Sequence, residues 1–149
     1  MKLNFRSYNF TTKAEEGNTL IFDIIRRKFV RLNPEEWVRQ HVLHYLTEDL
    51  GVPKGLISVE RSLVYNGMQK RFDIAVAASD GRLRLLVECK APNVKLSAAT
   101  LKQAGIYHKT LGVDGIFLSN GLQHIFMRWN ADNARFEISD QIPPFRDWI

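Results

Sequence analysis

Residues 71–90 have the sequence RFDIAVAASDGRLRLLVECK. An aliphatic run lies on each side of Asp80-Gly81, a pair of residues that favours the tight turn of a β-hairpin. Because side chains alternate between the two faces of a strand, Glu88 and Lys90 are expected on one face and Cys89 on the other. Asp73 belongs to the neighbouring strand and could meet Glu88 side by side. The stretch therefore predicts two paired strands on which two carboxylates and one ammonium converge.

The regions on both sides of this hairpin carry further helix and strand signals. Asn33-Pro34 has the character of a helix N-cap followed by the first helical position, and an apolar stripe extends that helix to about Asp49. A second helix is expected over residues 98–111, between a capping Ser97 and Gly112. Strands are expected at residues 57–66, 70–78, 83–91, 115–119 and 123–129, with a short one near Phe136. This order predicts an α/β or α+β domain with a mixed central sheet flanked by helices.

The N-terminal part carries weaker signals. Residues 1–18 are polar and are expected to be loosely ordered. Residues 20–32 are expected to form two short strands around Arg26-Arg27, whose basic side chains are interpreted as ordinary solubility charges. With 149 residues and no repeat or linker, the chain is predicted to be one domain, residues 1–149.

Composition narrows the classes of function. Hydrophobic residues make up 45% of the chain and charged residues 25%, which is typical of a globular protein and excludes a disordered or collagen-like chain. No apolar run is long enough to span a membrane. The single cysteine, Cys89, cannot form an internal disulfide, which favours a cytoplasmic location. The net charge of +5 weakly favours a polyanionic partner such as DNA.

The expected convergence of Asp73 and Glu88 has a chemical consequence. Two like charges held together raise each other's pKa unless a cation compensates them. Mg²⁺ prefers hard oxygen ligands, and a metal-bound water is a better nucleophile, which Lys90 could orient. These parts suit metal-assisted hydrolysis of a phosphodiester, and at such a site the loss of one carboxylate is expected to leave the metal-free fold unchanged or more stable. A surface salt bridge from Glu88 to Lys90 or Arg71 is the alternative that the residues alone leave open.

The pattern Asp73 … Glu88-Cys89-Lys90 resembles the signature of the PD-(D/E)XK nuclease superfamily. More narrowly, the chain resembles the N-terminal nuclease domain of type I restriction enzyme R subunits, in a free-standing form. The resemblance covers roughly residues 20–130. The matching segments are residues 34–40 (PEEWVRQ), 71–74 (RFDI), 87–92 (VECKAP) and 103–107 (QAGIY).

The resemblance implies a restriction-endonuclease-like fold and metal-dependent cleavage of DNA. Mg²⁺, for which Mn²⁺ can substitute, would be held by Asp73 and Glu88, with Lys90 at the attacking water. Glu36 is the best match to a further acid on the first helix, which would join the metal site. Gln103 and Tyr107 match a Gln-x-x-x-Tyr pair, in which the glutamine assists catalysis and the tyrosine contacts the DNA.

Three basic residues near the predicted site are candidates for contacts with DNA phosphates: Arg39, Arg71 and Lys102. Plain alternatives stay open for the helical candidates. Glu36 could simply complement the helix dipole as a first-turn acid, with Arg39 as its surface partner three residues later. Tyr107 could be a half-buried residue of an amphipathic helix.

Two departures limit the resemblance. Phe72 stands where the superfamily name records a proline. No Gly-x-x-x-x-Gly-Lys-Ser/Thr pattern occurs, so we expect no nucleotide cofactor and no ATP-driven motor. A second function stays open, in which the same fold is a non-catalytic module that binds nucleic acid, a protein partner or a second copy of itself.

Overall fold

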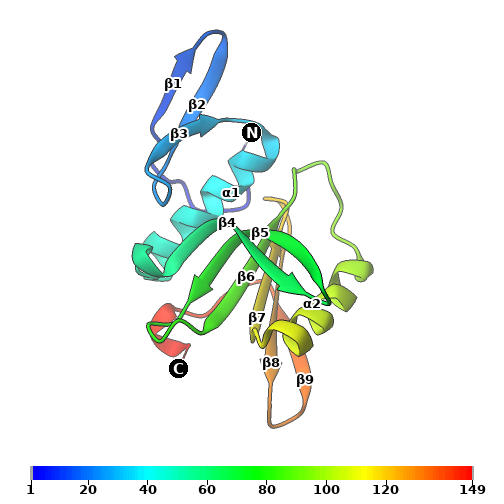
Figure 1. The fold of residues 1–149 in the computed structure, drawn as a ribbon. Coiled ribbons are helices and arrows are strands. Elements are labelled where there is room, and N and C mark those ends of the chain that lie inside the picture. The colour runs from blue at the N-terminus through cyan, green and yellow to red at the C-terminus, as the bar shows by residue number, and fades with distance from the viewer. Residues whose placement is uncertain (1, 149) are drawn as a thin grey trace.

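Two β-sheets organise the chain (Figure 1). The structure is a computed structural model that describes residues 2–148. The smaller sheet has three antiparallel strands in the order β1 (Thr12–Glu15), β2 (Asn18–Asp23) and β3 (Lys28–Arg31). Strands β2 and β3 confirm the pair expected around Arg26-Arg27, whereas β1 was not expected from the sequence.

The larger sheet has six strands that follow one another in sequence order. They are β4 (Ile57–Tyr65), β5 (Met68–Ala77), β6 (Leu83–Cys89), β7 (Gly115–Ser119), β8 (His124–Asn130) and β9 (Arg135–Ser139). Strands β6 and β7 are parallel, and the other neighbours are antiparallel. A parallel pair needs a long crossover connection, and α2 (Ala98–Leu111) lies in that connection. The predicted mixed sheet flanked by helices is confirmed.

Helix α1 spans Pro34–His44 and continues into a π-helical turn over Tyr45–Asp49. It begins where expected because the side-chain oxygen of Asn33 accepts a hydrogen bond from the Glu36 N–H at 2.7 Å. Helix α2 ends at Gly112, whose φ of 69° suits a residue without a side chain. Within the described residues, no helix is both long enough and apolar enough to cross a membrane.

Apolar side chains form one cluster on each face of the six-stranded sheet. The first cluster packs Val38 and Val42 of α1 against residues that include Val87 of β6. The second packs Tyr107 of α2 against residues that include Leu86 of β6. Both faces of β6 are therefore buried, and its side chains alternate between the two faces as the sequence predicted.

The first residues of the chain make specific contacts. Leu3 is buried in the α1-side cluster, and the Asn4 N–H donates to the Gly121 carbonyl oxygen at 2.7 Å. A Cβ atom at Gly121 would lie 2.8 Å from a Leu3 methyl carbon, so this glycine makes room for Leu3. Arg6 pairs with Asp49 at 2.6 Å. These contacts differ from the loose order that we expected for residues 1–18.

Candidate active site

Asp73 on β5 is held from two directions. Its Oδ1 accepts a hydrogen bond from Arg39 Nη2 of α1 at 2.9 Å, and its Oδ2 accepts one from the Cys89 N–H of β6 at 2.9 Å. Cys89 directly follows Glu88, so the two candidate acids lie at the same end of the β5–β6 hairpin. The Cys89 thiol is buried and its pKa is raised well above the ordinary value by burial and by Asp73, which fits a core thiol rather than a nucleophile.

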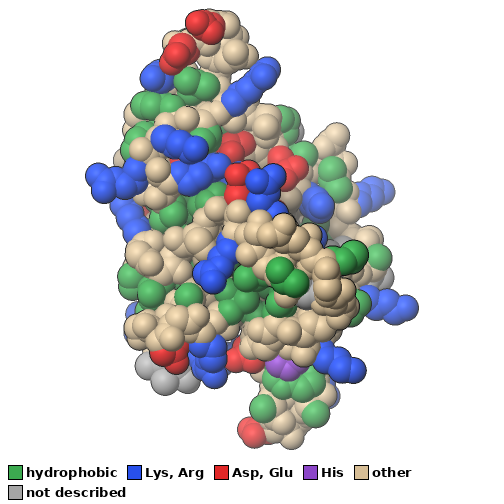
Figure 2. Space-filling view, in the orientation of Figure 1, with side chains coloured by type: hydrophobic (Ala, Val, Ile, Leu, Met, Phe, Trp, Pro, Cys, Tyr) green, Lys and Arg blue, Asp and Glu red, His purple; other side chains and the backbone are tan. Residues whose placement is uncertain are grey.

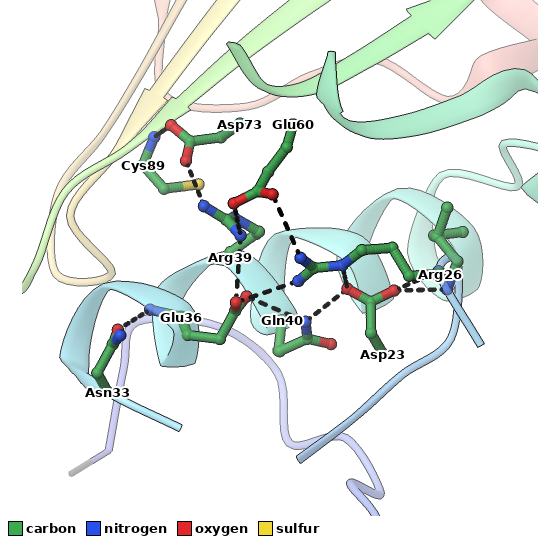
Figure 3. A network of polar contacts seen from close by, with 10 residues as sticks. Asp23, Arg26, Asn33, Glu36, Arg39, Gln40, Glu60, Asp73 and Cys89 are labelled. Carbon is green, nitrogen blue, oxygen red and sulfur yellow. Dashed lines mark hydrogen bonds and ion pairs between the residues drawn. The ribbon is translucent and has the colours of Figure 1, made fainter. Parts of the chain in front are cut away.

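Arg39 links Asp73 to two further carboxylates (Figure 3). Its Nη1 lies 3.1 Å from Glu36 Oε1 and 3.4 Å from Glu60 Oε1. Burial disfavours the charged guanidinium, but Glu36 and Asp73 outweigh that effect and raise the pKa of Arg39. A surface pair between Arg39 and Glu36 was the plain alternative at their spacing of three residues. They do pair at this spacing, but both side chains are buried and belong to a larger network.

A second arginine enters the same network from the smaller sheet. Arg26 lies in the turn between β2 and β3, and its Nη2 lies 3.1 Å from Glu36 Oε1 while its Nε lies 2.8 Å from Asp23 Oδ2. Gln40 Nε2 of α1 donates to Asp23 at 2.9 Å and to Glu36 Oε2 at 3.2 Å. Arg26 is therefore not the ordinary solubility charge that we expected, because its side chain is mostly buried among acids.

Glu88 on β6 has its own partners beside α2. Its Oε1 lies 3.1 Å from Lys70 Nζ and accepts a hydrogen bond from the Tyr107 hydroxyl at 3.3 Å. Burial opposes the charge on Lys70, but Glu88 and Tyr107 raise its pKa above the ordinary value. Burial and the charge of Glu88 also raise the pKa of Tyr107. Lys70 is thus the lysine in contact with Glu88, whereas the Lys90 side chain is exposed.

The two candidate acids, Asp73 and Glu88, contact different helices. Alternation of side chains along the two strands had predicted that they could meet side by side. Phe72 and Ala75 both pack in the α2-side cluster although they lie three residues apart. The strict alternation of β5 side chains between the two faces of the sheet is therefore interrupted between these residues. Asp73 consequently contacts α1, whereas Glu88 contacts α2. A shared cation between these carboxylates stays a prediction, and it requires both side chains to turn from Arg39 and Lys70.

An open pocket of about 390 Å³ lies beside the network. Its wall contains Glu36, Arg39 and Glu60, together with Asn33, Pro34, Glu35 and Ala91. Figure 2 shows acidic side chains gathered with Lys and Arg side chains below the three-stranded sheet. The pocket gives a small polar ligand access to the network.

The remaining candidates lie near this region with different exposure. Arg71 and Lys102 are exposed, Gln103 is partly buried, and Tyr107 is buried. The structure adds residues that sequence reasoning did not select for the site: Asp23, Arg26, Gln40, Glu60 and Lys70. The spacing of Asp23 and Arg26 around a turn was a weak signal for one ion pair, but the contact of Arg26 with Glu36 depends on how the small sheet packs beside α1.

The donor chemistry of the region fits a divalent cation such as Mg²⁺. Its carboxylate oxygens are hard ligands, and Asp73 and Glu88 each hold a side-chain cation already. Four carboxylates share the two guanidiniums of the network, which leaves an excess of negative charge; they are Asp23, Glu36, Glu60 and Asp73. In the described part of the chain, no three such side chains are already gathered as a metal-binding group.

Comparison with known proteins identifies the family. A family model described as "Type I restriction enzyme R protein N terminus (HSDR_N)" matches residues 34–143, which is more than half of the chain. The mixed sheet and its flanking helices therefore belong to the restriction-enzyme-related class of proteins. The chain is a member of the type I restriction enzyme R protein N-terminus family. Residues Asp23 and Arg26 lie before the matched segment.

A solved structure supports the fold. The chain is similar to a fragment of a putative HsdR subunit of a type I restriction enzyme from Vibrio vulnificus YJ016, with a TM-score of 0.52 and 21% identity over 75% of this chain. The chain spans about a quarter of that protein's length, because the match covers 24% of it. A search of curated proteins found no match.

Proposed function

We propose that this protein is a metal-dependent nuclease domain that hydrolyses DNA phosphodiester bonds. The observation that carries the proposal is the position of two acids at one end of the β5–β6 hairpin, where Asp73 accepts the N–H of the residue that follows Glu88. Membership of a restriction-enzyme family supports this assignment. The exposed Arg71 and Lys102 would contact DNA phosphates. Arg39, which was also expected to do so, is buried and paired with Glu36, Glu60 and Asp73, so it is not available for such a contact.

In this proposal Asp73 and Glu88 hold Mg²⁺ or Mn²⁺, and Glu36 is the candidate for a third acid. The bound cation would lower the pKa of a coordinated water and offset charge on the phosphate. Lys90 would orient the attacking water, and Gln103 would assist it by hydrogen bonding. Tyr107 is buried in the α2-side cluster, so its part in this proposal is to keep Glu88 in place through its hydroxyl rather than to contact the DNA strand.

The test is nicking of supercoiled plasmid with Mg²⁺, with Mn²⁺ and with EDTA. We expect cleavage by the wild type with either metal and none with EDTA. Asp73→Ala should abolish turnover, and an exposed acid of the β8–β9 turn gives a matched control, Asp132→Ala. Cleavage that persists in Asp73→Ala would assign the activity to another site or to a contaminant.

The second candidate function is a non-catalytic module on the same fold. The observation in its favour is that Arg39 and Lys70 already hold the two acids. This module would bind DNA, a protein partner or a second copy of the chain without cleaving. Salt-sensitive DNA binding without cleavage under any metal condition would support it.

A further inference from the structure

The three-stranded sheet enters the candidate site through one turn. Asp23 ends β2 and is fully buried. Its Oδ1 accepts the Ile25 N–H at 2.8 Å and the Arg26 N–H at 2.6 Å, which fixes the backbone of the turn. The next residue, Arg27, has a φ of 57°, so the chain reverses sharply there. This turn presents the Arg26 side chain to α1 and β4.

The Arg26 guanidinium divides its contacts among three carboxylates. Nε binds Asp23 at 2.8 Å, Nη2 binds Glu36 at 3.1 Å, and Nη1 lies 3.7 Å from Glu60 Oε2. Arg39 contacts the same Glu36 and Glu60, and it alone of the two arginines contacts Asp73. Arg26 therefore satisfies part of the charge that would otherwise attract Arg39.

Two buried polar atoms mark this network as incompletely satisfied. Arg39 Nε and Gln40 Oε1 are buried and have no hydrogen-bond partner within residues 2–148. Unsatisfied buried polar groups are costly and are concentrated at sites that bind a ligand or change arrangement. Arg39 thus holds Asp73 within a network whose buried polar atoms are not all paired.

We propose that Arg26 is a positioning residue that sets how strongly the acidic site binds its divalent cation. This inference rests on the proposed function. Arg26 shares Glu36 and Glu60 with Arg39, and Arg39 can therefore hold Asp73. Without Arg26, Glu36 and Glu60 draw Arg39 away from Asp73, and the cluster gains one negative charge. Both effects favour a cation at Asp73.

The experiment measures Mn²⁺ binding to the full chain without DNA, from the electron paramagnetic resonance signal of free Mn²⁺. We expect Arg26→Met to bind Mn²⁺ about tenfold more tightly than the wild type, because a positive charge near the site is removed. Arg31→Met is the matched control, since Arg31 is an exposed arginine of the same small sheet. An affinity in folded Arg26→Met that equals or falls below the wild-type value overturns the inference.

A second variant distinguishes the effect of the Arg26 contacts from the effect of its charge. The same variant provides the test if Arg26→Met does not fold. Arg26→Lys keeps the charge, but a lysine cannot contact three carboxylates as a planar guanidinium does. We expect its Mn²⁺ affinity to rise about threefold, and an affinity equal to the wild type would overturn the positioning role. A wild type that binds no Mn²⁺ would overturn the proposed function as well, whereas wild-type binding that Arg26 variants leave unchanged would overturn this inference alone.

Discussion

Arg39 Nη2 donates a hydrogen bond to Asp73 Oδ1 at 2.9 Å, so a cation carried by α1 occupies one oxygen of the acid on β5. The other oxygen accepts the Cys89 N–H. Both side chains are mostly buried, and the contact joins the first helix to the central hairpin. It therefore contributes to the fold as well as to the candidate site.

This contact reverses one expectation from the sequence. We now expect Asp73→Asn to destabilise the metal-free protein by about 2 kcal/mol, because the mutation removes one of the three carboxylates that pair with the buried Arg39. For a chain of this size the thermal midpoint should fall by roughly 4–8 °C. The measurement is thermal unfolding in EDTA, with the exposed Asp132→Asn as control. An unchanged or raised midpoint would restore the view that repulsion between acids dominates the empty site.

The stability should depend on pH through Asp23. Burial alone would raise the pKa of Asp23, but hydrogen bonds from Arg26 and Gln40 outweigh burial and lower it below the ordinary value of 3.8. The stabilisation is therefore complete above about pH 3.8 and is lost as the pH falls through the lowered pKa. Asp23→Asn should cost about 2 kcal/mol at pH 7, with a smaller difference from the wild type at pH 2.5. Urea unfolding at the two pH values measures this, and equal losses at both would contradict it.

The two lysines near Glu88 should have separable roles. Lys90→Ala should lose turnover and still bind Mn²⁺, because an ammonium is not a metal ligand. Lys70→Met removes the partner of Glu88 and should lower stability by about 1 kcal/mol, while it reduces turnover less than Lys90→Ala does. Plasmid nicking and Mn²⁺ binding on both variants compare them. If Lys70→Met abolished turnover and Lys90→Ala did not, the water-orienting role would belong to Lys70.

DNA binding should depend on the exposed cations beside the site. Arg71→Ala and Lys102→Ala should each weaken binding at low salt and reduce the slope of log affinity against log salt by about 1. The reason is that a variant with one phosphate contact fewer releases fewer counterions from the DNA when it binds. Fluorescence anisotropy at several salt concentrations gives these slopes. Lys54→Ala removes an exposed lysine from the turn before β4 and should leave the slope unchanged. Slopes equal to the wild-type slope in all three variants would show that Arg71 and Lys102 do not belong to the interface.

Local signals in the sequence predicted most of the fold. Asn33-Pro34 and Gly112 bound the two helices as expected, and Asp80-Gly81 lies in the turn between β5 and β6, where Gly81 has a φ of 86°. These residues act on their immediate neighbours, so their effects are visible without a structure. The parallel pairing of β6 with β7 joins segments that lie far apart in the sequence, and no local rule specified it.

The candidate site was less predictable for a related reason. Alternation correctly separated Glu88 from Cys89, but it failed for Asp73, because β5 changes its alternation between Phe72 and Ala75. Arg26 reaches Glu36 only after the small sheet packs beside α1, and Glu60 of β4 reaches Arg39 only after the larger sheet packs against α1. Charges that far apart in the sequence carry no spacing signal, so Arg26 was interpreted as an ordinary solubility charge and Glu60 was not selected.

The dispersed origin of the acidic network has a consequence for how the protein is made. Its members come from a turn of the small sheet, from α1, from β4 and from β5, and Glu88 receives the Tyr107 hydroxyl only across the crossover that follows β6. A ribosome releases these segments one after another. A nascent chain that has emerged only as far as β5 therefore lacks Glu88 of β6 and Tyr107 of α2. If the site cleaves DNA, its chemistry is withheld until β6 and α2 have joined the earlier elements, and a chain that ends before α2 would lack the complete site.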